Sequence, residues 1–191
     1  MLTQSTSPAR SPAKALGQAE FVALIAMLAA SVAFSIDAML PALPDIGTEL
    51  SPGNLTRAQL IITSFVLGMG LGTFITGPLA DRFGRKNVIL GGAVLYVCAT
   101  IFAFFTTTLE TMLAARVLMG LGAAAPRVVA MALVRDLYSG RDMARIMSFV
   151  MLVFSLVPAL APTLGAGIIA FSGWRGIFVA FAIFISLSTC W

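Results

Sequence analysis

Two side chains of opposite charge stand inside long apolar runs of this sequence. Asp37 lies about six residues, or ~9 Å, before one end of the first run, and Arg116 lies equally deep in the fourth run. A lone charge in hydrocarbon is expensive, and two opposite charges at one depth offset part of that cost. We predict that Asp37 binds and releases a proton and that Arg116 tunes its proton affinity. The alternative is that both side chains snorkel to the outer interface.

Arg116 also begins a regular pattern. Arg116, Gly120, Ala123 and Arg127 recur at i, i+4, i+7 and i+11, so they share one face of a helix. Two arginines separated by small residues indicate either the wall of a wet cavity or very close helix packing. We favour the cavity, because Arg127 otherwise needs a buried counter-charge of its own. The predicted substrate cavity is lined by Asp37, Arg116 and Arg127.

The segment Gly77–Lys86 is a charge-dense turn between two apolar runs. A membrane protein places such a turn only at a water-facing surface. Gly77 and Pro78 are predicted to end a helix, Asp81 to accept bonds from amides at a helix start, and Arg85 to pair with Asp81 one turn away. The predicted conformational latch comprises Gly77, Asp81, Arg82, Gly84, Arg85 and Lys86. A merely topogenic loop explains two of its cations, Arg82 and Lys86, equally well.

Composition indicates which elements hold these residues. The chain is 59% hydrophobic and 10% charged, with a mean hydropathy of +0.99, whereas soluble domains are about a quarter charged. Lipid is therefore its expected solvent, and continuous rather than alternating apolar runs favour helices over a barrel. The expected fold is an all-α membrane protein, a six-helix bundle. The predicted spans are 21–43, 58–79, 88–107, 111–134, 144–170 and 175–191.

The cations predict the orientation. Eight cations are expected on one side of the membrane: two lie in the tail, and the other six follow the second and fourth apolar runs. Arg57 and Arg175 are expected on the opposite side. This bias places both ends of the chain in the cytoplasm. The group is Arg10, Lys14, Arg82, Arg85, Lys86, Arg135, Arg141 and Arg145. Because the net charge of +4 is scattered in this topogenic way, we expect no nucleic-acid partner. Residues 1–19 are expected to be a disordered cytoplasmic tail.

Residues for enzyme chemistry are scarce. The sequence has no histidine, and it contains no Walker-type loop, lipase elbow or Cys/His cluster. The run Gly120-Leu-Gly122-Ala-Ala-Ala formally matches a dinucleotide fingerprint but lies inside a predicted membrane helix. We therefore predict no enzymatic activity, no cofactor and no metal.

A faint internal repeat recurs 89 residues along the chain. The matched positions are Gly84, Lys86 and Val88 with Gly173, Arg175 and Ile177. Each group stands at the entrance to the third helix of a triplet. Because three is odd, the two triplets are predicted to be inverted repeats, as in many secondary transporters.

Several motifs resemble one transporter family. The Gly77–Lys86 turn resembles the hinge motif of the major facilitator superfamily, and Arg116–Ala124 resembles the helix-4 motif of its proton-linked members, with Met119 where that family usually has Gln. Asp37 with Leu40–Pro44 resembles the helix-1 motif of twelve-helix drug/proton antiporters. The segment with Pro158, Pro162 and Gly165 resembles the helix-5 antiporter motif, but has Ala161 where the usual Gly-Pro pair begins. Val134–Ser148 and Gly173–Phe178 are similar to the bicyclomycin and chloramphenicol resistance branch.

The resemblance implies twelve helices in two halves, with the substrate between them. Residues 20–191 then form the amino-terminal half, truncated inside an apolar run, of a proton-driven multidrug efflux antiporter of the bacterial inner membrane. Its expected partners are the bilayer, protons, a small hydrophobic drug-like substrate, and the missing six-helix half or a second copy. The alternatives are a sugar or metabolite uniporter or symporter on the same fold, a non-transporting scaffold or half-size protein, and an intramembrane enzyme.

Overall fold

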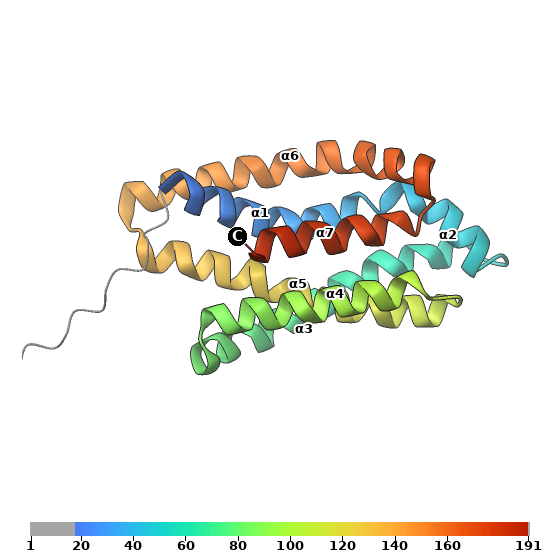
Figure 1. Ribbon diagram of the computed structural model, residues 1–191, viewed down its shortest axis with the longest axis horizontal. Coiled ribbons are helices and arrows are strands. Elements are labelled where there is room, and N and C mark those ends of the chain that lie inside the picture. Colours follow the sequence, from blue (N-terminus) through green and yellow to red (C-terminus); the bar gives the residue numbers. More distant parts are fainter. Residues whose placement is uncertain (1–17, 191) are drawn as a thin grey trace, which may run out of the picture.

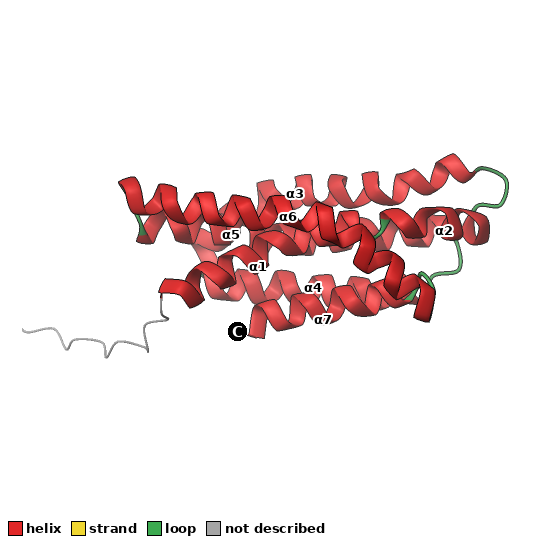
Figure 2. Ribbon diagram, turned by 90° about the horizontal axis from the view of Figure 1, so that it is seen from above, coloured by secondary structure: helices red, strands yellow, loops and turns green. Residues whose placement is uncertain are grey.

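A computed structural model describes residues 18–190 as an elongated bundle of helices joined by short loops, and no strand occurs in that range (Figure 1; Figure 2). The elements are α1 (Gln18–Asp37), η1 (Leu40–Ala42), α2 (Leu43–Leu50), η2 (Leu55–Gln59), α3 (Leu60–Phe83), α4 (Arg85–Phe104), α5 (Leu109–Leu137), α6 (Gly140–Ser172) and α7 (Gly176–Cys190). Nearly all of the predicted tail, residues 1–19, lies outside the described residues.

The six predicted apolar segments appear in the predicted order, which confirms an all-α membrane fold. Five of them are long and apolar enough to cross a bilayer, and α7 is apolar but shorter. The first segment is longer than predicted and reaches Leu50. Its helix is broken at η1 and starts again as α2, with proline in the first turn of each new element. Proline suits a first turn, where its missing N–H has no intrahelical partner to lose.

The end predicted for the second span is wrong. Gly77 and Pro78 do not end α3, which continues for another turn to Phe83. An internal proline removes one backbone bond but does not have to stop a helix that is held by its neighbours. The helix ends instead at Gly84, whose φ of +83° is strained for other residues and whose N–H donates to the Ala80 carbonyl at 3.0 Å. One residue therefore separates α3 from α4.

The backbone bears out the internal repeat. Gly173 has a φ of +69°, and its N–H donates to the Ile169 carbonyl at 2.9 Å, as Gly84 does one triplet earlier. Val88 and Ile177, the matched apolar positions, are both buried. Helix α1, which begins the first triplet, and α5, which begins the second, run in opposite directions along the bundle, so the two triplets are inverted relative to each other (Figure 1).

Small residues place α5 at the centre of the bundle, against α3 and α4, while α6 packs mainly along α1 (Figure 1). A Cβ atom at Gly120 would overlap the Phe65 carbonyl oxygen, and one at Gly68 would overlap the Val117 carbonyl oxygen. The α3 and α5 backbones are therefore in direct contact. At Gly165 the backbone of α6 is in direct contact with the first span, because a Cβ atom there would overlap the Ala38 carbonyl oxygen.

Candidate functional site

Arg116 lies at the centre of the bundle and is 0% exposed. Its Nη2 donates to the Ser35 carbonyl of α1 at 3.1 Å, and its Nε donates to the Ile61 carbonyl of α3 at 3.4 Å. The side chain starts on α5, so one guanidinium joins three helices. This burial excludes the alternative in which Arg116 snorkels to the interface.

Aromatic rings complete the surroundings of the guanidinium. Its central carbon lies 4.9 Å from the Phe65 ring centroid and 6.0 Å from that of Phe181. Nη1 lies 4.0 Å from the Met119 sulfur, at the position where the resembling family usually has Gln. No carboxylate of the described residues forms an ion pair with Arg116. Its positive charge is therefore held by carbonyl dipoles, ring faces and the Met119 sulfur.

The contact continues from Ser35 to α4. The Ser35 hydroxyl donates to the Ser31 carbonyl at 2.8 Å, so the Tyr96 hydroxyl, 2.5 Å away, is the donor in the bond between the two side chains. Tyr96 is 2% exposed. Neither residue was predicted from the sequence, although a serine and a tyrosine hydroxyl inside apolar runs are a signal of a buried polar contact.

The expected ion pair between Asp37 and Arg116 is not formed. Asp37 is the last residue of α1, is partly exposed, and has no hydrogen bond or ion pair within residues 18–190. The side chain of Ser35 points to Tyr96, and a residue two positions along a helix points ~200° away. Arg116 thus bonds the backbone of α1 two residues before Asp37, while the carboxylate of Asp37 faces another direction.

Arg127 lies apart from both of them. It is partly buried, its Nη1 donates to the Met69 sulfur at 3.5 Å, and it lines a cavity of about 40 Å³ with Ala29 and Val150. Neither Asp37 nor Arg116 lines that cavity. None of the cavities described among residues 18–190 is lined by all three residues, and their shared cavity stays a prediction. The alternative interpretation of this face, close helix packing, applies to Gly120, which contacts the α3 backbone, and to the buried Ala123.

The charged turn is arranged differently from the prediction. Arg85 forms its ion pair with Asp136 in the last turn of α5, not with Asp81. The reason is the one-residue turn at Gly84, which makes Arg85 the first residue of α4 and directs it to the neighbouring end of α5. Asp81 is exposed and has no hydrogen bond or ion pair in the described part of the chain. The exposed Arg82 lies over the Phe83 ring, 5.5 Å from its centroid.

The candidate helix-5 motif lies within α6, which is the fifth membrane span because α1 and α2 belong to the first one. Helix α6 is continuous through both prolines. Pro158 is exposed and Pro162 is partly buried, whereas Gly165 is buried against Ala38 of the first span. Since Ala38 follows Asp37, the glycine of this motif is the member that packs beside the candidate proton carrier.

A cluster at the other end of the bundle was missed from the sequence. Glu49 accepts a bond from Trp174 Nε1 at 2.7 Å and one from Arg175 Nη2 at 2.8 Å. The same arginine donates to the Thr106 carbonyl at 3.4 Å and stacks on Trp174, 4.0 Å from the ring. These contacts connect α2, the α4–α5 loop and the α6–α7 turn. Adjacent Trp and Arg residues at a span end were a usable signal for an interfacial contact.

Comparison with known proteins identifies relatives of this bundle. The sequence profile of the Major Facilitator Superfamily matches residues 23–191. The chain is 37% identical over 144 residues to a chloramphenicol resistance protein of Pseudomonas aeruginosa, an alignment that covers 75% of this chain and 34% of that protein. It is 32% identical over 163 residues to a bicyclomycin resistance protein homolog of Haemophilus influenzae, covering 85% and 41%.

A third relative is the multidrug resistance protein MdtL of Escherichia coli, 37% identical over 150 residues, with 78% of this chain and 38% of the relative covered. The chain thus spans between about a third and two fifths of the length of these relatives.

Proposed function

The chain belongs to the major facilitator superfamily, and we propose that it acts as the amino-terminal half of a proton-driven multidrug efflux antiporter. The observation that carries the proposal is the buried Arg116, whose charge meets no carboxylate among the described residues. A charge kept in a membrane core at such a cost has a function by default.

The proton carrier in this proposal is Asp37. The guanidinium of Arg116 holds the carbonyl of Ser35, two residues before Asp37, so a shift of α1 relative to α5 changes the distance between the two charges. Binding of a proton by Asp37 would weaken its attraction to Arg116 and favour one facing state. Drug and proton then compete for a pathway that passes Asp37 and Arg116 and continues along α5 towards Arg127. The names of the relatives support drugs as the substrates.

The turn between α3 and α4 serves as the latch in this scheme. Asp81 is exposed and is available to a helix start on a second six-helix half. The ion pair between Arg85 and Asp136 holds α4 against α5 while the latch opens. The remaining members of the proposed latch are Gly77, Arg82, Gly84 and Lys86. The helix-5 motif of Pro158, Pro162 and Gly165 positions α6 against the turn of the first span that carries Asp37.

We place the protein in the bacterial inner membrane with its amino terminus in the cytoplasm. The start of α1 and the two turns α3–α4 and α5–α6, where the cations gather, lie at the same end of the bundle (Figure 1). The positive-inside bias supports this orientation.

The test is proton release driven by drug in everted vesicles that contain the assembled transporter. Asp37→Asn is expected to abolish drug-coupled proton movement while drug binding survives, and Arg116→Met is expected to abolish both. Asp45→Asn, at an exposed site on α2, is the matched control. Unchanged coupling in Asp37→Asn removes Asp37 from the mechanism. Collapsing the proton gradient should raise drug accumulation in cells, whereas no rise would favour a sugar or metabolite carrier.

A further inference from the structure

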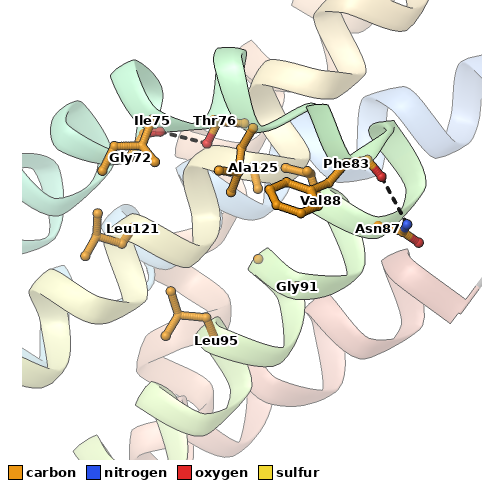
Figure 3. A pocket seen from close by; sticks show the side chains of 12 residues that line it. Gly72, Ile75, Thr76, Phe83, Asn87, Val88, Gly91, Leu95, Leu121 and Ala125 are labelled. Atoms are coloured by element: carbon orange, nitrogen blue, oxygen red, sulfur yellow. Dashed lines mark hydrogen bonds between the residues drawn. The ribbon is translucent and has the colours of Figure 1, made fainter. Parts of the chain in front are cut away.

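An apolar groove of about 540 Å³ lies between α3 and α4, with α5 as its floor (Figure 3). Its volume falls within the range of small-molecule sites, roughly 300–1,000 Å³. Small residues keep it open: Gly72 and Thr76 on α3, Gly91 on α4 and Ala125 on α5. Larger apolar side chains, such as Ile75 and Leu95, form its sides. None of the residues proposed for proton coupling lines this groove.

The groove has the length of one bilayer leaflet. It begins at Gly72, halfway along α3, and ends at Phe83, the last residue of that helix. These two positions are ~16 Å apart along the helix axis, at 1.5 Å per residue. Half of a hydrocarbon core of ~30 Å is nearly the same length. The groove therefore runs from the middle of the bundle to one of its surfaces.

The surface end of the groove is positively charged. Phe83 and Asn87 line this end, and Asn87 Nδ2 donates to the Phe83 carbonyl at 3.0 Å. The Arg82 guanidinium lies over the Phe83 ring, and Lys86 directly precedes Asn87. Both cations are exposed, and neither forms an ion pair within the described range.

One carboxylate, that of Asp81, belongs to the same turn. Since Arg85 is already paired with Asp136, Arg82 and Lys86 leave this end with a net positive charge.

We propose that this groove binds one acyl chain of an anionic phospholipid whose headgroup is held by Arg82 and Lys86. The groove is apolar along one leaflet and cationic at one end, which is the charge pattern complementary to such a lipid. A packed helix would match the apolar lining but would leave both cations without a counter-charge, and a compact drug would not fill the length. The groove is separate from the residues proposed for proton coupling, and its two cations are shared with the proposed latch. The lipid site does not depend on drug export, because it requires only the groove and the two charges.

Lipid retention by the purified 191-residue chain tests the proposal. Phosphatidylglycerol and phosphatidylcholine with identical acyl chains are titrated separately, and bound lipid is counted by native mass spectrometry. We expect one phosphatidylglycerol to bind preferentially. Each of Arg82→Gln and Lys86→Gln should weaken it about fivefold, the equivalent of ~1 kcal/mol per cation, without changing phosphatidylcholine binding. Equal retention of the two lipids by the unmodified chain overturns the proposal.

A second pair of variants tests the groove itself. A Cβ atom at Gly91 or at Gly70 meets nothing within 4 Å, but only Gly91 lines the groove. Gly91→Leu is expected to remove the bound lipid, and Gly70→Leu is expected to retain it, with equal thermal midpoints.

Lipid retention by Gly91→Leu overturns the proposal. Conversion of a dimer to a monomer by this variant also overturns it, because a second copy of the chain is then the occupant. The charge variants lie at exposed positions and keep the proposal testable if Gly91→Leu fails to fold.

Discussion

Helices α5 and α6 cross the same bundle and have nearly the same hydropathy, yet α5 buries fourteen of its 29 residues and α6 only four of its 33. Both also contain internal proline. What differs is side-chain size. Half of the buried residues of α5 are Gly or Ala, whereas the exposed face of α6 carries large side chains such as Leu152, Leu164 and Phe171.

The difference shows what determines position in a membrane bundle. Lipid tails are as apolar as leucine, so hydrophobicity does not drive one helix against another. Close backbone contact does, and it requires small residues at the contact. Helix α5 has such residues along its length, and α6 has them chiefly where Gly165 meets Ala38.

The largest expected effect is at Gly120. Its substitution by Ala places a Cβ against the backbone of Phe65 and Met69 on α3, which cannot move without parting the two helices. We expect a loss of about 3 kcal/mol or more in the free energy of unfolding. The thermal midpoint in detergent measures it. Gly167→Ala on α6, where a Cβ meets nothing within 4 Å, is the control and should not be destabilised. Equal thermal midpoints for the two variants would contradict the conclusion that α5 depends on close backbone contact more than α6 does.

A smaller effect is expected at Gly165. A Cβ atom there overlaps the backbone of Ala38, so α6 is displaced from the first span while the contacts of the central helix α5 stay in place. We expect destabilisation of about 1–2 kcal/mol. Hydrogen exchange should rise in α6 and remain unchanged in α5. A uniform rise would mean that α6 supports the whole bundle, contrary to its low burial.

The Glu49 cluster is the next test, because Arg175 fixes the turn at which α6 ends. Glu49→Gln removes the charge from a partly exposed ion pair while an oxygen remains for Trp174, so we expect a loss of about 1 kcal/mol. Thermal unfolding at low and high salt measures it. Glu110→Gln is the control, because its pair with Arg57 is longer, at 3.5 Å, and more exposed. If the two variants lose equally, the cluster is not a specific anchor.

The smallest effect is expected at the opposite end of α5. A double-mutant cycle with Arg85→Gln and Asp136→Asn should give a coupling energy below about 1 kcal/mol, since both partners are partly exposed. Urea denaturation of the four proteins measures this coupling. A value of several kcal/mol would make this pair as important to α5 as its glycine contacts.

The sequence predicted the spans and the repeat well, because both follow from local chemistry. Apolar runs long enough to cross a bilayer must be helical, and Gly84 and Gly173 mark positions where φ is positive. The continuation of α3 through Pro78 was missed, because the strength of a proline break depends on what packs around the helix.

Side-chain partners were much harder to predict. Asp81 and Asp136 are both carboxylates within reach of a turn at Arg85, and only the direction of α4 after Gly84 selects Asp136. The partners of Arg116 are backbone carbonyls, which every residue has, so no residue type marks them. The roles of Asp37, Arg116 and Arg127 in transport remain predictions to be tested in the assembled transporter.

The two carbonyl bonds of Arg116 also bear on how this protein tolerates sequence drift. A carbonyl oxygen persists whatever side chain occupies position 35 or 61, so substitutions of similar size at these two buried positions leave both acceptors in place. Replacement of Ser35 by Ala would break the link to Tyr96 and spare the arginine. A saturation library should therefore show position 116 as intolerant of every substitution, and its two buried acceptor positions as tolerant of residues of similar size.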